Sequence, residues 1–369
     1  MNDRGPMPGL EEFRTYPLNS WYVGATSAEV GRSLLGRSIL GEPVLFYRDE
    51  AGTVVALEDV CPHRAMPLSQ GQLDGDCVVC GYHGFVFAAN GDCVRAPSQE
   101  RVPYGAKVRS YVVREEPPVV WVWLGDPAMA AEKDPPRLPW LHSEDYVVFD
   151  YQLHVEANYL ALHDNSLDLT HFPYVHQELS PAGYTEGPPP LQVEVSEFSV
   201  TYSRTFPPGP LPEWQNKATG LDPNANYVLR ESGSFVSPGV HLNHMDIAES
   251  EDRLDGPDAY RKPYVRGFTP EGPYSTHVFA WVARNYARDD SEVTEQLRGV
   301  HERLLREDKM VLETIQAHAA RYYRNMNLTL VNADAAAVRA HEIVNNMLMR
   351  ERGGRLHYRQ AMQGTPRDH

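Results

Sequence analysis

The two stretches that decide the fold are Cys61-Pro62-His63-Arg64 and Cys80-Gly81-Tyr82-His83, with sixteen residues between His63 and Cys80. Each stretch supplies one thiolate and one imidazole, in the order Cys-x-His and then Cys-x-x-His. Two similar loops of this kind can hold a two-metal unit from both sides. Pro62 stiffens the first loop, and Gly81 and Gly84 let the backbone of the second approach the metals.

These ligands are the set that a Rieske [2Fe-2S] centre needs, with Cys61 and Cys80 on one iron and His63 and His83 on the other. Such a centre passes on one electron at a time, and its neutral histidines raise its potential above that of an all-cysteine cluster. Zinc is the alternative, because two cysteines and two histidines also bind zinc. The interleaved order disfavours it, since finger sites usually present a cysteine pair and then a histidine pair.

The other two cysteines, Cys77 and Cys93, are predicted to be small apolar core residues. Cys77 and Cys80 also form a Cys-x-x-Cys motif, and a redox dithiol is the alternative interpretation. Neither ligand loop contains a further cysteine, whereas respiratory-chain Rieske proteins carry two more there. The pattern is therefore typical of a soluble, oxygenase-type Rieske domain.

Composition restricts the class of protein and its partners. A chain of 369 residues, 42% of them hydrophobic, has room for two domains with ordinary cores. No segment approaches ~20 apolar residues, and Met1-Asn2-Asp3-Arg4 has no apolar signal core, so we expect no membrane partner. Four cysteines leave no disulfide framework, which favours the cytoplasm. The net charge of -16 disfavours binding to nucleic acid.

The pattern of turns predicts an all-β first domain. Short β-type runs separated by turn residues extend from Trp21 to Gly125, and both ligand stretches fall in loops between them. The proline-rich segment Asp134 to Pro139 is predicted to be a linker. We therefore place a boundary near Ser143, with a cluster domain at 1–143 and a catalytic domain at 144–369.

The second domain is predicted to combine an antiparallel sheet with flanking helices, which makes the whole chain an α+β protein. A strand at Val147–Tyr151 precedes a helical segment that contains His163, and alternating strands follow. Phe206–Pro212 contains four prolines and is predicted to be a loop, because proline cannot donate to a sheet ladder. Long helices are expected at Asp289–Arg321, with Met310 and Ile315 on its apolar face, and at Ala333–Met349.

The segment from Asn165 to His176 is the second chemical signal. Two neutral histidines and one carboxylate form the facial triad of non-haem Fe(II) oxygenases, which leaves positions open for O2 and substrate. On an ideal helix His171 and His176 point about 140° apart, so Pro173 is expected to break the helix between them. Asp168 stands three residues before His171 and can orient its imidazole. Two unrelated histidines are the alternative.

Beside the predicted cluster, the string Asp164-Asn165-x-x-Asp168-Leu169-x-His171-x-x-Tyr174-Val175-His176 makes a resemblance clear. Over nearly its whole length the chain is similar to the α subunits of Rieske non-haem iron oxygenases. It most resembles the homo-oligomeric monooxygenases of the dicamba and vanillate O-demethylase type. The resemblance implies a helix-grip catalytic domain and adds Asn165 and Asp168 as catalytic candidates.

By this resemblance the carboxylate ligand lies on the long C-terminal helix, in Arg306-Glu307-Asp308-Lys309, and we assign it to Asp308. Glu307 is the rival. Because a helix turns about 100° per residue, only one of the two is expected to face inward with Leu304. Asp308 lies on the apolar stripe of the helix, four residues after Leu304.

The resemblance also implies the electron path. In a head-to-tail homotrimer, Asp168 would bridge His171 of its own chain and His83 of the neighbouring chain. Electrons would come from a separate NAD(P)H-dependent reductase, with or without a ferredoxin, because the chain lacks a Gly-x-Gly-x-x-Gly nucleotide fingerprint. A locally basic run would either dock an acidic ferredoxin or be merely solvated; it comprises Arg95, Arg101, Lys107, Arg109 and Arg114.

The implied reaction uses O2 to oxidise a C–H bond of a small aromatic or heterocyclic substrate, by O- or N-demethylation. Ring or alkyl hydroxylation and cis-dihydroxylation are alternatives on the same scaffold; a Rieske electron carrier and a redox sensor are alternatives outside the enzyme class. An inward-facing Arg266 would favour a carboxylate-bearing substrate. The substrate-pocket candidates are Asn158, Phe206, Phe235, His241, Asn243, Arg266 and Trp281.

Overall fold

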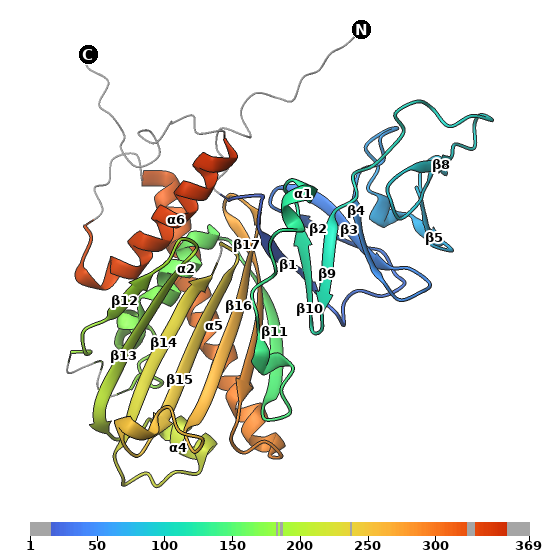
Figure 1. Ribbon diagram of the computed structural model, residues 1–369. Helices are drawn as coiled ribbons and strands as arrows, with labels where there is room; N and C mark the ends of the chain where they lie inside the picture. The colour runs from blue at the N-terminus through green and yellow to red at the C-terminus, as the bar shows by residue number, and fades with distance from the viewer. Residues whose placement is uncertain (1–15, 182–183, 185–186, 237, 323–328, 353–369) are drawn as a thin grey trace, which may run out of the picture.

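The computed structural model describes residues 16–181, 184, 187–236, 238–322 and 329–352. The outer ends of both predicted domains, 1–15 and 353–369, lie outside the described residues. The described chain combines small and large antiparallel sheets with several helices, as the α+β prediction requires (Figure 1). None of the described helices combines the length and the apolar character needed to cross a bilayer.

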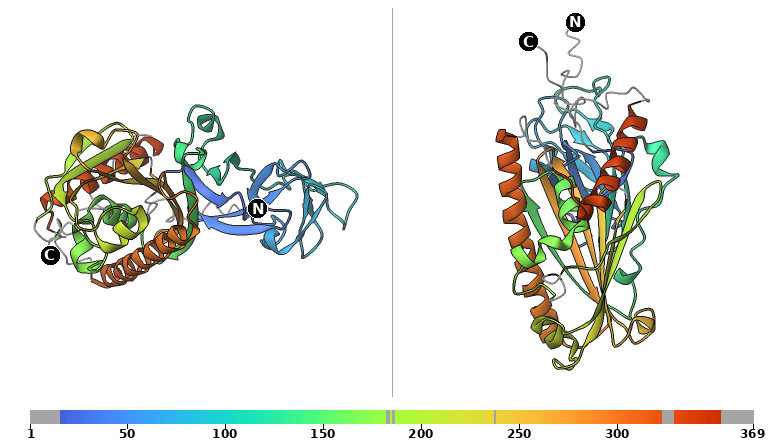
Figure 2. Two further views of the ribbon diagram at one scale, coloured as in Figure 1. Left: turned by 90° about the horizontal axis from the view of Figure 1, so that it is seen from below. Right: turned by 90° about the vertical axis from the view of Figure 1, so that its left-hand side faces the viewer.

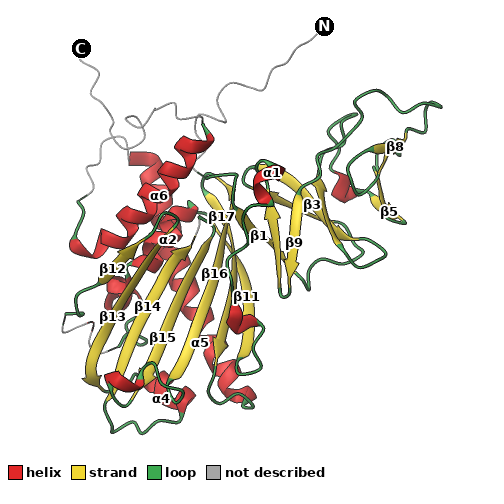
Figure 3. Ribbon diagram, in the orientation of Figure 1, coloured by secondary structure: helices red, strands yellow, loops and turns green. Residues whose placement is uncertain are grey.

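The N-terminal part consists of short strands that form three small antiparallel sheets within the described residues. Their orders are β1-β10-β9, β2-β3-β4 and β5-β6-β7-β8, and Figure 3 shows short strands joined by loops in this part of the molecule. The strands are β1 (Trp21–Thr26), β2 (Leu35–Ile39), β3 (Glu42–Arg48), β4 (Val54–Glu58), β5 (Gln72–Asp74), β6 (Cys77–Val79), β7 (Val86–Phe87), β8 (Cys93–Arg95), β9 (Val112–Glu116) and β10 (Val119–Trp123).

The C-terminal part is built on one antiparallel sheet of seven strands, in the order β11-β17-β16-β15-β14-β13-β12. Side chains that lie opposite each other in register share one face of the sheet, so each row of partners can be assigned to a face. The strands are β11 (Val147–Val155), β12 (Gln192–Val195), β13 (Ser199–Gly209), β14 (Tyr227–Val236), β15 (Val240–Ala248), β16 (Tyr260–Gly272) and β17 (Ser275–Arg284).

Helices cover one face of this sheet, and the sheet curves around them in the left-hand view of Figure 2. α2 (Tyr159–Leu167) packs on β14 to β16, α5 (Ser291–Tyr322) on β11, and α6 (Ala335–Glu351) on β13. This arrangement, with a long helix gripped by a curved sheet, is the expected one. The other helical elements are α1 (Pro127–Ala130), α3 (Phe172–Val175), α4 (Glu213–Thr219) and the 3-10 turns η2 (Leu68–Gln70), η3 (Pro139–Leu141), η4 (Leu169–His171), η6 (Glu251–Arg253) and η8 (Asn332–Asp334).

Two local predictions were wrong. Pro207 and Pro208 belong to β13 rather than to a loop, because the ladder with β14 shifts register between Phe206 and Gly209 and β12 has already ended there. A bulge of this kind accepts residues that cannot donate. Met310 and Ile315 do not belong to the buried stripe of α5, since they are 64% and 54% exposed.

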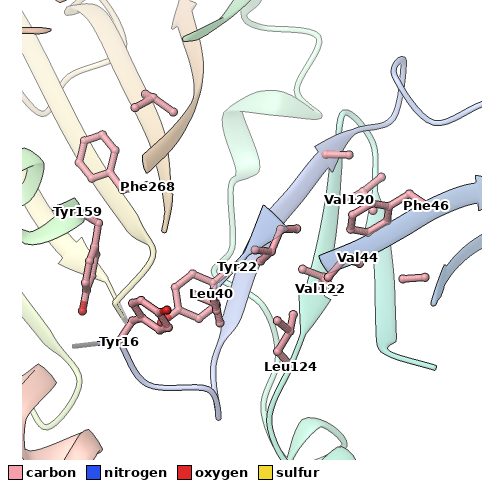
Figure 4. Close-up of a cluster of buried hydrophobic side chains, with 14 of the residues drawn as sticks. Tyr16, Tyr22, Leu40, Val44, Phe46, Val120, Val122, Leu124, Tyr159 and Phe268 are labelled. Carbon is pink, nitrogen blue, oxygen red and sulfur yellow. The ribbon is translucent and has the colours of Figure 1, made fainter. Parts of the chain in front are cut away.

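The two parts of the molecule share a continuous hydrophobic core, shown in Figure 4. Tyr22 and Val122 come from the N-terminal sheets, whereas Tyr159 comes from α2 and Phe268 from β16. A second cluster joins Trp21, Trp121 and Trp123 to Trp281 on the opposite face of the large sheet. The orientation of the two parts is therefore set by buried apolar surface rather than by a flexible linker. The boundary near Ser143 itself stays a prediction.

Candidate metal centres

The two ligand loops of the N-terminal part have the same backbone design. In the first, the Cys61 amide donates to Met66 and the Ala65 amide donates back to Cys61, at 2.9 and 2.8 Å. In the second, the Cys80 amide donates to Phe85 and the Gly84 amide to Cys80, at 2.8 and 3.1 Å. The residue that closes each loop has a positive φ, 56° at Ala65 and 69° at Gly84. Each loop thus closes through its own backbone hydrogen bonds.

The four predicted cluster ligands come together with cysteines inside and histidines outside. Cys61 and Cys80 are buried, whereas His63 and His83 are exposed and their ring centroids lie 4.5 Å apart. Burial raises the pKa of the Cys61 thiol, with Cys80 beside it as a further cause. Two buried thiols next to two neighbouring imidazoles fit the two-cysteine, two-histidine donor set of a Rieske cluster.

The structure also shows the surroundings of Gly81, of the two remaining cysteines and of Tyr82 in this region. A Cβ on Gly81 would lie 2.8 Å from the Gln70 carbonyl oxygen, so this glycine lets the second loop pack against the chain beside Gly71. Cys93 is buried as predicted, while Cys77 is only half-buried. Tyr82 is 62% exposed and its ring lies 3.7 Å from that of His83, which extends the aromatic surface around the exposed histidines.

The second predicted centre begins where α2 ends. Asp168 has extended backbone angles (φ -121°, ψ 103°), so the helix stops there, and the short turn η4 carries His171. Pro173 then occupies the first turn of α3, where proline is well tolerated. The helix is therefore broken at Asp168, before His171, rather than at Pro173. His176 nevertheless turns back toward His171, as the sequence predicted.

His171, His176 and Asp308 converge from two distant segments. Asp308 Oδ1 lies 3.0 Å from His176 Nε2 and 3.5 Å from His171 Nε2, and the three ligand atoms are within 4.8 Å of one another. His176 is fully buried and the other two are half-buried. Two imidazoles and one carboxylate on one side of a common point have the geometry of a facial iron triad.

Hydrogen bonds on the outer edges of the two imidazoles fix their orientation. His176 Nδ1 lies 2.7 Å from Glu307 Oε2, and His171 Nδ1 lies 2.8 Å from the Asp168 carbonyl oxygen. Because both outer partners are acceptors, Nδ1 carries the proton and each Nε2 presents a lone pair inward. His171 Nε2 is buried without a hydrogen-bond partner among the described residues. A proton on His176 Nε2, or a cation between these nitrogens and the carboxylate, satisfies this arrangement, and the two-imidazole, one-carboxylate donor set fits a divalent iron.

These contacts change two details of the prediction. Asp168 orients His171 through its backbone carbonyl, because its carboxylate instead accepts from the Thr170 amide at 2.9 Å. Glu307 and Asp308 both face the site and contact opposite edges of His176, so Glu307 is a partner of the triad rather than a solvated rival.

The charges around the triad suit a metal. Burial works against ionisation of Asp308, but the neighbouring imidazoles of His176 and His171 hold its pKa below the usual range. Burial likewise opposes protonation of His176, but Asp308 and Glu307 raise its pKa. Burial lowers the pKa of His171, which keeps this imidazole neutral and able to coordinate. Asn165 donates from Nδ2 to Asp308 Oδ1 at 3.1 Å and so fixes the carboxylate further.

A cavity opens beside the triad, between the large sheet and α5. Of the predicted pocket residues, Asn243 and Arg266 line it, together with Asn165, His171 and Asp308. Most of its polar lining was not predicted from the sequence, although the spacing of His301 seven residues before Asp308 on one helix was a signal. The other lining residues are Leu169, Phe172, Leu179, Trp214, Glu231, Ser232, His244, Met245, Lys262, Tyr264, His301, Leu304 and Leu305.

Five predicted pocket residues lie outside this cavity. The side chain of Asn158 accepts from the Leu160 amide as the N-cap of α2. Phe206 packs with Tyr184, while Phe235 and His241 surround the buried His163. Trp281 points to the opposite face of the sheet, in the core shared with the N-terminal part. Alternation along β17 decided the position of Trp281. Phe206, Phe235 and His241 share the face of Glu231 but lie farther along their strands.

Comparison with known proteins agrees with both centres. Residues 20–111 match the family described as "Rieske [2Fe-2S] domain", and residues 155–350 match "Vanillate O-demethylase oxygenase C-terminal domain". A protein that joins these two domains is a Rieske non-haem iron oxygenase, with a [2Fe-2S] cluster and a mononuclear iron as its cofactors. This chain belongs to the vanillate O-demethylase family of such enzymes, and it is a monooxygenase.

Individual relatives support this assignment along most of the chain. The iron-sulfur subunit of the toluene-4-sulfonate monooxygenase system of Comamonas testosteroni is 33% identical over 304 residues, which are 76% of this chain and 82% of that protein. The oxygenase component of dicamba O-demethylase from Stenotrophomonas maltophilia is 32% identical and covers 77% of this chain and 83% of its own. The crystal structure of dicamba monooxygenase bound to 3,6-dichlorosalicylic acid superposes with a TM-score of 0.85 at 30% identity, over 91% of this chain and 98% of that one.

Proposed function

We propose that this monooxygenase demethylates a small aromatic substrate, with Cys61, His63, Cys80 and His83 holding the cluster and His171, His176 and Asp308 holding the iron. The observation that carries the proposal is the cavity that joins two members of the triad, His171 and Asp308, to a largely apolar wall with a few buried polar groups. Such a cavity suits an aromatic ring that is oriented by polar substituents.

When bound, the cluster supplies electrons and the iron activates O2 beside the substrate. The protein contributes orientation: Glu307 and the Asp168 carbonyl hold the two imidazoles, and Asn165 holds the carboxylate. The apolar wall, which includes Phe172 and Leu304, keeps bulk water from the reacting carbon. A methyl ether, O2, two electrons and two protons would then give a phenol, formaldehyde and water.

Direct hydroxylation of a C–H bond is the second candidate. Toluene-4-sulfonate, from which the most similar relative described above takes its name, has neither an O-methyl nor an N-methyl group. A monooxygenase that accepts such a compound leaves an alcohol and releases no formaldehyde. The family assignment makes the chain an enzyme, so an isolated electron carrier or sensor is no longer an alternative.

The partner proposal is a head-to-tail homotrimer that receives electrons from a separate ferredoxin or reductase. The relatives are components of multi-component systems, which supports an external electron donor. In Figure 1 the sheet β5 to β8, next to the ligand loops, lies at the end of the molecule away from α2 and α5, so electrons from a neighbouring subunit are the simpler route. Asp168 would bridge to the neighbour's His83. The cytoplasmic location stays a prediction.

The basic run offers only part of the predicted docking surface. Arg109 donates to the carbonyls of Leu124 and Gly125, and Arg114 pairs with Asp134. Lys107 pairs with Asp92 at 2.9 Å. Arg95 and Arg101 are exposed and are the members of the run that we assign to an acidic ferredoxin.

The test combines the purified protein with a surrogate reductase, NADH and O2, and measures formaldehyde and NADH consumption. The panel contains methoxybenzoates, N-methyl aromatic compounds and toluene-4-sulfonate. Demethylation predicts formaldehyde in proportion to NADH, and the Asp308→Asn variant provides the control for background formaldehyde. Consumption of NADH with an alcohol product and no formaldehyde would instead select direct hydroxylation.

A further inference from the structure

The cavity beside the triad carries buried charges that the reaction chemistry described above does not use. Arg204 on β13 lies opposite Glu231 on β14, Glu231 lies opposite Met245 on β15, and Met245 lies opposite Lys262 on β16. All four side chains therefore share the face that is covered by helices. Arg204 is the immediate cross-strand neighbour of Glu231 and offsets its charge. Lys262 is left as a surplus cation in this row.

The closest contacts of Lys262 are neutral, and Glu231 attracts it from beyond ion-pair distance. Lys262 is 6% exposed; its Nζ lies 3.1 Å from His301 Nε2 and 4.9 Å from the centre of the Trp214 ring. Among the described residues, no carboxylate lies within ion-pair distance of this ammonium group. Burial lowers the pKa of Lys262 to about 8, so the charged form still predominates at neutral pH. A buried charge is costly unless it is paired, which indicates that an anion from outside the chain completes the site.

His301 offers a further donor. Its Nε2 accepts from the ammonium group of Lys262, so its proton is on Nδ1, and Nδ1 has no hydrogen-bond partner among the described residues. Burial also keeps the pKa of His301 well below its usual range, so the ring stays neutral beside Lys262. The described residues in direct contact with Lys262 thus provide a donor and an aromatic face, and no carboxylate is among them.

Arg266, the cation named by sequence analysis, is less suited to this task. Its guanidinium donates to Asn243 and lies over the Tyr264 ring, 4.7 Å from the ring centre. It also lines a small second cavity together with Asn165 and Asp308. An anionic substrate group bound there would lie close to the Asp308 carboxylate and be repelled by it. Glu231 also lines the cavity near Lys262, but Arg204 and Lys262 both offset its charge, and burial raises its pKa to about 7, so it repels an anion less than Asp308 does.

The spacing along α5 relates Lys262 to the triad. His301 and Asp308 are seven residues apart on one helix, which separates them by about 10 Å along its axis. This separation suits a single aromatic ring that carries substituents at opposite positions. Met245, Tyr264 and Leu304 line the cavity and provide apolar contacts for such a ring.

We propose that Lys262, His301 and Trp214 form an anion subsite that binds the carboxylate or sulfonate group of a single-ring aromatic substrate. The C–H bond to be oxidised then lies at the opposite end of the ring, beside His171 and Asp308. This subsite specifies which class of substrate the cavity would bind, so the inference rests on the proposed function.

Binding without turnover tests the subsite separately from the reaction. Isothermal titration calorimetry on the holoenzyme, with no reductase present, compares 4-methoxybenzoate with its neutral methyl ester. Replacing Lys262 by Met removes the charge and keeps the chain length. Because hydrogen bonds to charged groups are among the stronger ones, Lys262→Met is expected to weaken binding of the acid about tenfold to a hundredfold. Binding of the ester should change by less than about threefold.

Two further variants serve as controls. Lys262→Arg retains the charge and should retain most of the affinity for the acid. Lys217→Met removes an exposed lysine of α4, the helix that carries Trp214, and should bind both ligands as the wild type does. Unchanged affinity of Lys262→Met for the acid would overturn the proposal. An equal loss of affinity for acid and ester would also overturn it, because Lys262 would then only pack the cavity.

Two isomers of methoxybenzoate test whether the substrate lies with its acid group at Lys262 and its methyl group at the triad. The 4-methoxy acid should release more formaldehyde per NADH than the 2-methoxy acid, whose methyl group stays near the Lys262 end. Equal yields would refute the placement. If binding depends on Lys262 but no methoxybenzoate releases formaldehyde, the subsite stands and the demethylation fails, so the two outcomes are distinguishable.

Discussion

The two metal centres of this protein differ most in their exposure to solvent. At the proposed cluster site His63 and His83 are exposed and Tyr82 beside them is 62% exposed, whereas at the proposed iron site His176 is fully buried and Asp308 is 14% exposed. An electron can enter through exposed ligands because transfer needs only close approach of a partner. Oxidation of a C–H bond requires seclusion, since water in the site would consume reactive intermediates. The contrast therefore separates electron entry from substrate chemistry.

The two centres also differ in how far apart their ligands lie in the sequence. All four proposed cluster ligands fall between residues 61 and 83, in loops that close through their own backbone hydrogen bonds. The iron triad joins His176 to Asp308 across 132 residues. The cluster site is thus a local structure, while the iron site exists only when α5 packs against the sheet.

The largest expected effect separates the two centres directly. His176→Ala removes a buried ligand, so iron per chain should fall from three, two in the cluster and one mononuclear, to two. Visible absorption of the cluster should remain, and turnover should fall to background. Metal analysis with absorption spectroscopy measures both quantities. Loss of the cluster as well would show that the two centres are not independent.

Asp168→Asn tests the link between the centres. The hydrogen bond from His171 goes to the Asp168 backbone carbonyl, so this substitution leaves the hydrogen bond intact. Both metals should therefore remain bound. If the carboxylate bridges to the neighbour's His83, turnover should lose most of its rate while substrate affinity is unchanged. The measurement is steady-state turnover with metal content as the control. Full activity would remove Asp168 from the electron path.

Glu307→Gln should have a smaller effect at the buried site. Glu307 Oε2 accepts from His176 Nδ1 at 2.7 Å and fixes the ring without touching the metal. Changes to such outer partners typically cost about 10- to 100-fold in metal affinity or activity. Iron titration of the metal-depleted protein gives the affinity. Arg303→Gln, which removes the other partner of Glu307, is the control and should weaken iron binding less.

The smallest expected effect concerns the support of the iron site by α6. His341 on α6 lies 2.8 Å from Asp164 on α2, and although burial opposes it, this hydrogen bond raises the pKa of His341. The pair therefore stabilises the fold fully below the unfolded pKa of about 6.5 and loses this contribution as the pH rises through the folded pKa.

Denaturant unfolding at several pH values tests this pair. Between about pH 6 and pH 9 the unfolding free energy of the wild type should fall relative to that of His341→Gln. The difference should stay below about 1 kcal/mol, because the pair is partly exposed. If the unfolding free energies of the two proteins change with pH in parallel, the His341–Asp164 pair does not stabilise the fold.

The sequence by itself determined the two kinds of metal centre, the order of domains and the type of sheet, while the individual ligands that it named stay predictions. These features depend on residue types at short spacing, and local backbone geometry is enough to express them. It also favoured Asp308 over Glu307 by helical phase, although both residues turned out to contact His176.

Tertiary structure alone decided which face of the large sheet lines the cavity. Period-two alternation places Arg266 and Trp281 on opposite faces of neighbouring strands, but it does not say which face the helices cover. Only packing against α5 brought Lys262, His301 and Trp214 together from three separate elements. The substrate-binding part of this protein was therefore the part that sequence could not specify, because its contacts join residues that are far apart in the chain.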